Sequence, residues 1–174
     1  MASVMKAVTL VWTLKVTVRP SLAHKQRQEV NLIDCLIIGD SIAVGTKQFR
    51  PDCVAFAKGG INSGQWRRQY LEGDKGSLPL AETLIISLGS NDHKGVNTRA
   101  EIAKIRTAVT GKRVYWILPH GNNTASGVDI KDIQSAVREV AEGFGDTVLP
   151  INRVQTDNIH PSWAGYKELG ANAK

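Results

Sequence analysis

The chain contains five short runs of mostly apolar residues, each ending near a glycine, a proline or a polar cluster. Within the runs the apolar side chains occupy consecutive positions, which is typical of strands buried on both faces of a sheet. We therefore predict five buried strands, at residues 32–39, 53–57, 83–88, 113–118 and 147–151.

Helices are predicted between these strands. The clearest apolar spacing is that of Ile130, Ile133 and Val137, which places the three side chains on one helical face. Strands alternating with helices favour a parallel sheet, because parallel neighbours need a crossover connection. The expected fold is an α/β three-layer sandwich, with a five-stranded parallel sheet flanked by helices in a flavodoxin-like arrangement. The predicted helices cover residues 42–49, 62–71, 99–109, 128–144 and 161–169, with Asn62 or Ser63 and Thr98 as caps and Pro161 in the last helix's first turn.

Residues 1–30 differ in character from the rest of the chain. Apolar residues alternate with others over residues 8–18, as in a β-strand, so we predict a β-like N-terminal arm. The same stretch loosely resembles a signal sequence, but its apolar part is short and is interrupted by Lys15. We therefore divide the chain into an arm, residues 1–30, and a single domain, residues 31–174.

Composition limits the class of protein. With 174 residues, 42% of them hydrophobic and 22% charged, the chain suits one globular domain and excludes a disordered, collagen-like or coiled-coil protein. No apolar run approaches the ~20 residues that a membrane-spanning helix needs. Cys35 and Cys53 each lie in an apolar run, so we expect two buried, reduced thiols.

Charge is concentrated in the arm. The net charge is +6, and residues 1–30 hold five cationic side chains against the single Glu29. No nucleic-acid-binding motif accompanies these cations, so we predict no specific nucleic acid partner. A solvated arm, or an arm that forms a homo-oligomer or a larger assembly, is the favoured interpretation. The alternative is contact with an acidic partner or surface.

Candidate chemistry lies at the ends of the predicted strands. Parallel strands place their carboxyl ends at one edge of the sheet, where open α/β folds bind ligands. The polar clusters expected there are residues 39–41 (Gly-Asp-Ser), 59–60 (Gly-Gly), 89–92 (Gly-Ser-Asn-Asp) and, before the last helix, 157–160 (Asp-Asn-Ile-His). Their convergence predicts one site built from four loops.

The same clusters carry a family resemblance. G-D-S at 39–41, a glycine at 60, G-x-N-D at 89–92 and D-x-x-H at 157–160 resemble, in order, the four sequence blocks of the SGNH (GDSL-type) hydrolases. The resemblance runs from about residue 32 to the C-terminus. It implies the SGNH-hydrolase fold and a serine esterase. The sequence has no metal-ligand spacing and no nucleotide-binding motif, so we expect no metal and no cofactor.

The chemistry of ester hydrolysis assigns roles to three residues. Ser41 is the candidate nucleophile, and a serine hydroxyl needs a base to take its proton. His160 is the candidate base, and Asp157 lies three residues earlier, close enough to orient the imidazole ring.

The resemblance also implies an oxyanion hole. Its donors would be the backbone N–H groups of Ser41 and Gly60 and the side-chain amide of Asn91; Gly59 remains an alternative to Gly60. Three aromatic residues follow site segments and are candidate substrate contacts, although each could instead serve packing. These substrate-side candidates are His120, Trp66 and Trp163.

The predicted function is hydrolysis of carboxylic esters. Because the loops are short, we expect small acyl groups, such as acetyl groups on a carbohydrate. One alternative is a lipase or thioesterase acting on longer acyl chains. Another is a structural or binding component, in a virion or cell-surface complex, that retains the hydrolase fold. The sequence leaves the compartment open.

Overall fold

The structure is a computed structural model that describes residues 32–73, 78–121 and 127–174. The predicted arm and the signal-like stretch lie outside these residues. In the described parts of the chain, ten elements alternate as expected. The strands are β1 (Leu32–Gly39), β2 (Cys53–Ala57), β3 (Leu80–Ser87), β4 (Gly111–Ile117) and β5 (Thr147–Leu149), and the helices are α1 (Ser41–Lys47), α2 (Ser63–Tyr70), α3 (Thr98–Ala108), α4 (Ile130–Phe144) and α5 (Trp163–Asn172).

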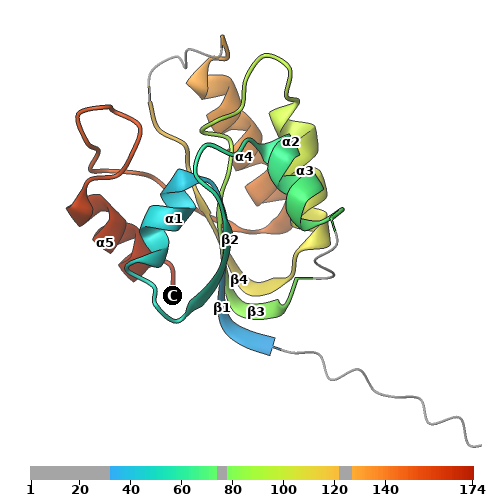
Figure 1. The fold of residues 1–174 in the computed structure, drawn as a ribbon, viewed down its shortest axis with the longest axis vertical. Helices are drawn as coiled ribbons and strands as arrows, with labels where there is room; N and C mark the ends of the chain where they lie inside the picture. The colour runs from blue at the N-terminus through green and yellow to red at the C-terminus, as the bar shows by residue number, and fades with distance from the viewer. Residues whose placement is uncertain (1–31, 74–77, 122–126) are drawn as a thin grey trace, which may run out of the picture.

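All five strands pair in parallel, in the order β2-β1-β3-β4-β5. Helices α1 and α5 cover one face of the sheet, and α2, α3 and α4 cover the other (Figure 1). The predicted three-layer α/β fold is therefore confirmed. None of the helices in the described parts of the chain is long and apolar enough to cross a membrane.

Strand β1 explains why the sheet is covered on both faces. Leu36 and Ile38 face the core cluster under α2–α4, whereas Cys35 and Ile37 face the cluster under α1 and α5. All four side chains are fully buried. Successive strand residues point to opposite faces, so a strand apolar at every position requires a layer of helices on each side.

The strand order also determines where a site can form. From β1 the chain crosses to β2 on one side, and from β2 it returns to β3 on the other side of β1. This reversal lies at the carboxyl ends of β1 and β3, the position at which open α/β sheets bind ligands.

Some predicted boundaries were wrong by a few residues. The cap of α3 is Asn97, not Thr98, because the Asn97 side chain accepts the N–H of Ala100. Pro161 lies outside α5, because Ser162 caps that helix by accepting the N–H of Gly165.

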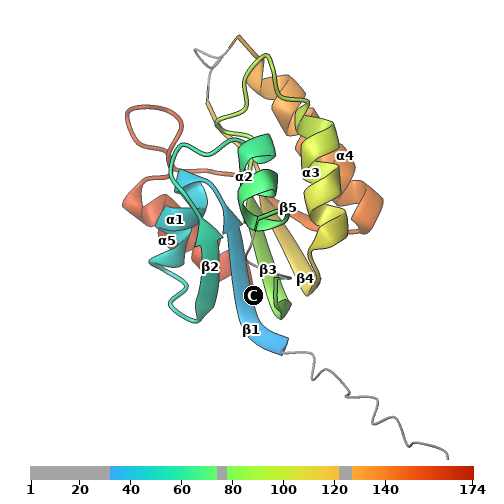
Figure 2. The same ribbon diagram turned by 45° about the vertical axis from the view of Figure 1, so that its right-hand side comes forward.

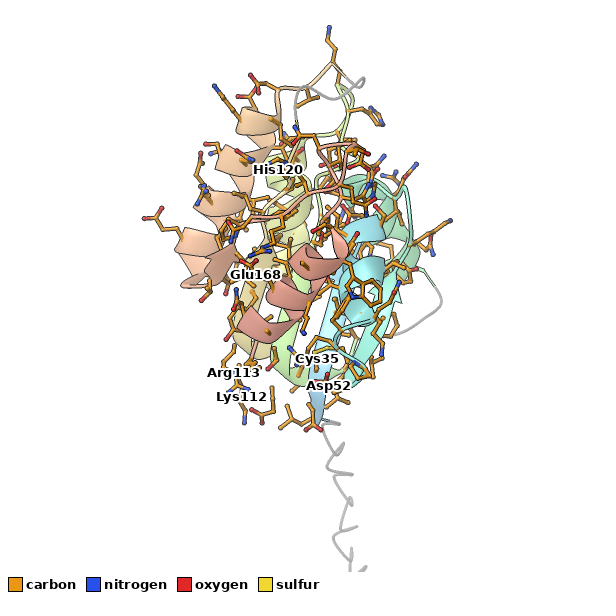
Figure 3. All side chains as sticks on the ribbon, turned by 90° about the vertical axis from the view of Figure 1, so that its left-hand side faces the viewer. Cys35, Asp52, Lys112, Arg113, His120 and Glu168 are labelled. Atoms are coloured by element: carbon orange, nitrogen blue, oxygen red, sulfur yellow. A yellow bond between two sulfur atoms is a disulfide. The ribbon has the colours of Figure 1, made fainter. Side chains whose placement is uncertain are left out.

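The prediction of two reduced thiols was wrong. Cys35 of β1 and Cys53 of β2 are directly paired in the sheet register, with Cα atoms 4.2 Å apart, and they form a disulfide. Both residues are buried. Figure 3 places Cys35 toward the lower part of the sheet, away from His120 at the upper end.

Replacing both cysteines by alanine should lower the free energy of unfolding by roughly 3 kcal/mol, the stabilisation expected for a closed loop of this size. The bridged residues are 18 positions apart. Denaturant unfolding with and without reductant measures the change. Detection of two free thiols by a thiol reagent, in protein unfolded without any reductant, would contradict the disulfide.

Candidate active site

The turn after β1 places Ser41 at the first position of α1. Gly39 has φ +142°, and a Cβ there would lie 1.9 Å from the carbonyl oxygen of Ser87 in β3, so only glycine fits. The N–H of Asp40 donates to the same oxygen at 3.0 Å. The end of β3 therefore holds the turn that carries Ser41.

A second loop, between β5 and α5, carries Asp157 and His160. Its two sides are joined by backbone hydrogen bonds from Ser162 N–H to Arg153 C=O and from Gln155 N–H to His160 C=O, both 2.8 Å. Asn158 at its tip has φ +58°, a left-handed conformation that asparagine tolerates better than most residues. The loop is thus held at its base and turns sharply between Asp157 and His160.

The two loops bring three predicted residues into one chain of hydrogen bonds. The Oγ atom of Ser41 lies 2.9 Å from Nε2 of His160, and Nδ1 of His160 lies 2.7 Å from Oδ2 of Asp157. In Figure 1 the loop preceding α5 reaches the same end of the molecule as the start of α1. Ser41 and His160 are 119 residues apart, so only the fold brings them together.

The charge of Asp157 determines the direction of these hydrogen bonds. The backbone N–H of Ile159, followed by the His160 side chain, lowers the pKa of Asp157 from 3.8 to about 2. An ionised carboxylate only accepts hydrogen bonds, so Nδ1 of His160 carries the proton. In the neutral ring, Nε2 is then the acceptor for the Ser41 hydroxyl.

The three predicted oxyanion donors follow β1, β2 and β3 at the carboxyl edge of the sheet. The N–H of Ser41 is at the first position of a helix and has no intrahelical acceptor. Gly59 and Gly60 form a turn that is closed by a hydrogen bond of 3.4 Å from the N–H of Ile61 to the C=O of Lys58. Gly60 has φ +73°. One N–H of the Asn91 amide donates to the Ile61 carbonyl at 3.2 Å, which links the Asn91 loop to that turn.

Two buried aspartates support these loops. Asp40 caps α1 through Ile42 N–H and also accepts the hydroxyl of Ser87, both at 3.0 Å. Asp92 accepts the N–H of Ser63 at 2.7 Å and so ties the Asn91 loop to the start of α2. The G-D-S pattern did not predict the contact between Asp40 and Ser87, because Ser87 lies 47 residues later in the sequence, in β3.

The three substrate-side candidates have different environments. Trp66 cannot contact a substrate, which corrects that prediction: its ring is fully buried in the core under α2–α4, and its Nε1–H donates to Phe56 C=O at 2.8 Å. Trp163 is 70% exposed, with its ring centroid 4.6 Å from that of Phe49. Nδ1 of His120 donates to Asn158 C=O at 2.9 Å, so His120 packs against the loop of Asp157.

One group of possible metal ligands lies away from this site. Potential ligand atoms of Cys35, Asp52 and Cys53 are within 4.8 Å of one another, the only such group among the described residues. Both sulfur atoms are in a disulfide and are therefore not thiolate ligands.

Comparison with known proteins gives matches in structure but not in sequence. The sequence matches no family model, and no curated protein is significantly similar to it. The C-terminal catalytic domain of peptidoglycan O-acetyltransferase A from Streptococcus pneumoniae is similar in structure, with a TM-score of 0.62 at 19% identity, over 82% of this chain and 93% of that domain.

Two further structures are similar over most of their length. A lipase/acylhydrolase from Enterococcus faecalis has a TM-score of 0.58 at 17% identity, over 80% of this chain and 92% of that one. An acetyl-xylooligosaccharide esterase from Geobacillus has a TM-score of 0.54 at 17% identity, over 82% and 91%. Others are described as members of the G-D-S-L lipolytic family or as an SGNH hydrolase. This chain therefore has the fold of the SGNH (GDSL-type) hydrolases.

The stability of the protein should fall as Asp40 ionises. Burial raises the pKa of Asp40 from 3.8 to about 6, against the opposing hydrogen bonds from Ile42 and Ser87. Between these pH values the folded state binds more protons than the unfolded state, so stability present below pH 3.8 is lost as the pH rises through 6.

The Asp40→Asn variant removes this titration. Relative to the variant, the wild type should lose roughly 2 kcal/mol of unfolding free energy between pH 4 and pH 7. Urea unfolding of both proteins across this range measures the difference. A difference that does not change with pH would show that Asp40 is not desolvated.

Proposed function

We propose that this protein is a serine esterase in which Ser41, His160 and Asp157 form the catalytic triad. The observation that carries the proposal is the chain of hydrogen bonds from the Ser41 hydroxyl through the His160 ring to Asp157, at 2.9 and 2.7 Å. The solved structures of esterases and acylhydrolases with this fold support an ester hydrolase class.

In the proposed reaction, Ser41 Oγ bonds to the ester carbonyl carbon while its proton passes to Nε2 of His160. The oxyanion formed accepts hydrogen bonds from the N–H groups of Ser41 and Gly60 and from the Asn91 amide. As the C–O bond to the alcohol breaks, His160 returns the proton to the leaving oxygen. Water then adds to the acyl-enzyme by the same route and releases a carboxylic acid.

The hollow beside the proposed oxyanion turn supports a polar alcohol. The hollow next to Gly60 is lined mainly by polar side chains, among them Gln65 and Gln69, which suits a sugar better than a long hydrocarbon chain. An acetyl group on a carbohydrate fits these features, and the Geobacillus structure is described as an acetyl-xylooligosaccharide esterase.

Transfer of the acyl group to a second sugar is the other candidate reaction, because the Streptococcus pneumoniae domain is described as an O-acetyltransferase. Hydrolysis is favoured because the side chains of His160 and Asp157 are 34% and 42% exposed, so water can reach an acyl-enzyme at Ser41. Adding a sugar acceptor to the assay separates the two reactions: an acetylated acceptor indicates transfer, and acetate alone indicates hydrolysis.

The Ser41→Ala variant should lose at least about a thousandfold of kcat toward p-nitrophenyl acetate, because no other group supplies the nucleophile. A fluorophosphonate should label the wild type at Ser41, as located by peptide mass spectrometry. The control Ser135→Ala changes an exposed hydroxyl in α4 and should keep both properties. Equal hydrolysis by the Ser41→Ala variant and the wild type would refute the esterase proposal.

The Asp157→Asn variant should lose about a thousandfold or more of kcat while remaining folded, since a neutral amide no longer holds the imidazole with its proton on Nδ1. The control Asp132→Asn removes an exposed carboxylate in α4, and its kcat should match the wild type. Retention of full activity by Asp157→Asn would show that the Asp157–His160 contact plays no part in turnover.

A further inference from the structure

A hollow of about 500 Å³ lies beside the Gly59–Gly60 turn. This volume is within the range of roughly 300–1,000 Å³ typical of small-ligand sites. In Figure 2 the connection from β2 to α2 runs along the carboxyl edge of the sheet, next to the start of α1. The turn proposed to bind the oxyanion is therefore also a wall of the hollow, whose lining residues are Lys58, Gly59, Gly60, Ile61, Gln65, Arg68 and Gln69.

The wall of the hollow has two cationic side chains and no anionic one. Lys58 comes directly before the glycine turn, and Arg68 lies on the exposed side of α2. Among the ion pairs formed between described residues, neither Lys58 nor Arg68 takes part. The adjacent Arg67 differs, because Glu72 and Glu101 neutralise it.

The backbone of Lys58 is connected to the proposed nucleophile. Its N–H donates to the C=O of Gly39 at 3.0 Å, two residues before Ser41. The amide of Asn91 contacts Ile61, another wall residue, at 3.2 Å. A ligand held in the hollow would thus lie against the turn that is proposed to stabilise the reaction's oxyanion.

A second, smaller hollow of about 220 Å³ continues on the other side of Arg68. The two hollows share Gln65 and Arg68, so Arg68 stands between them. Glu101, the acid that lines the second hollow, is already paired with Arg67. The first hollow contains no acidic side chain, so the positive charge of Arg68 is available to a ligand there.

We propose that Lys58 and Arg68 form a subsite for the carboxylate of an acidic sugar, so that the substrate is an O-acetylated uronic acid or a polymer containing it. This inference rests on the proposed esterase function. An acetyl group carries no charge, so an anion bound in this hollow must belong to the alcohol part of the ester. A guanidinium group can donate two parallel hydrogen bonds to a carboxylate, and Gln65 and Gln69 can bond to sugar hydroxyls.

Matched substrates test the proposal. The kcat/KM of the wild type should be at least about tenfold higher for acetylated glucuronic acid than for acetylated glucose, which differ at the carboxylate, and added salt should reduce this preference. The Arg68→Gln variant should reduce the preference to about threefold, and Lys58→Gln/Arg68→Gln should abolish it.

The matched control is Arg138→Gln/Lys167→Gln, which removes two exposed cations from α4 and α5, outside both hollows. It lowers the net charge by the same amount and should keep the wild-type preference. A preference lost equally in this control would assign the effect to overall charge and overturn the subsite.

Failure of the subsite and failure of the esterase proposal give different results. Ser41-dependent hydrolysis of p-nitrophenyl acetate without any preference for the uronate ester would overturn the subsite and leave the esterase proposal intact. If no ester is hydrolysed, calorimetric titration of the wild type with glucuronate and with glucose decides. Equal binding of the two sugars would overturn the subsite, whereas preferential glucuronate binding that is lost in Arg68→Gln would support it without catalysis.

Discussion

The close approach of Gly39 to the carbonyl group of Ser87 is the constraint on which the site depends. The last residues of β1 and β3 are paired, and a Cβ at position 39 would lie 1.9 Å from the Ser87 oxygen. The same two segments exchange two more contacts, Asp40 N–H to Ser87 C=O and the Ser87 hydroxyl to the Asp40 carboxylate, each 3.0 Å. The position of Ser41 is thereby determined by β3 as well as by its own strand, and β3 also leads into the Asn91 loop. The proposed nucleophile, Ser41, and the proposed oxyanion donor, Asn91, are therefore held by one pair of strands rather than by two independent loops.

The sequence was most informative where a local pattern and the sheet architecture act together. The bounds of β1 and β2 match the prediction. In β1 the match follows from its apolar residues on both faces, which leave few other structures available. The prediction that β2 is buried was wrong, because β2 is an edge strand and its residues Val54 and Ala55 are exposed. Asp157 and His160 could be associated from their spacing, since a tight turn brings residues three apart within reach. Their approach to Ser41 followed from the rule that parallel strands share one carboxyl edge.

The wrong predictions concern contacts that depend on how two strands align, or on which side of a helix faces the core. Cys35 and Cys53 pair because β1 and β2 align at that register, which no pattern within either strand specifies. Trp66 follows the glycine turn in sequence, but its place on α2 directs the ring into the core, two positions before the exposed Arg68. The hollow beside Gly60 was not predicted for the same reason: Lys58 and Arg68 come from separate elements, and only the packing of α2 beside the turn brings them to one concavity.

The contrast between Trp163 and the other described tryptophans has a spectroscopic consequence. Trp66 and Trp116 are fully buried on the sheet, whereas Trp163 is 70% exposed and follows His160 by three residues. The emission of the buried indoles reports on the integrity of the core, and that of Trp163 reports on the solvent next to the β5–α5 loop. Collisional quenchers such as acrylamide or iodide reach an exposed ring far more readily than a buried one. The difference in emission between the wild type and the Trp163→Phe variant is therefore the emission of Trp163. It is an intrinsic probe beside the loop of His160 that needs no attached label.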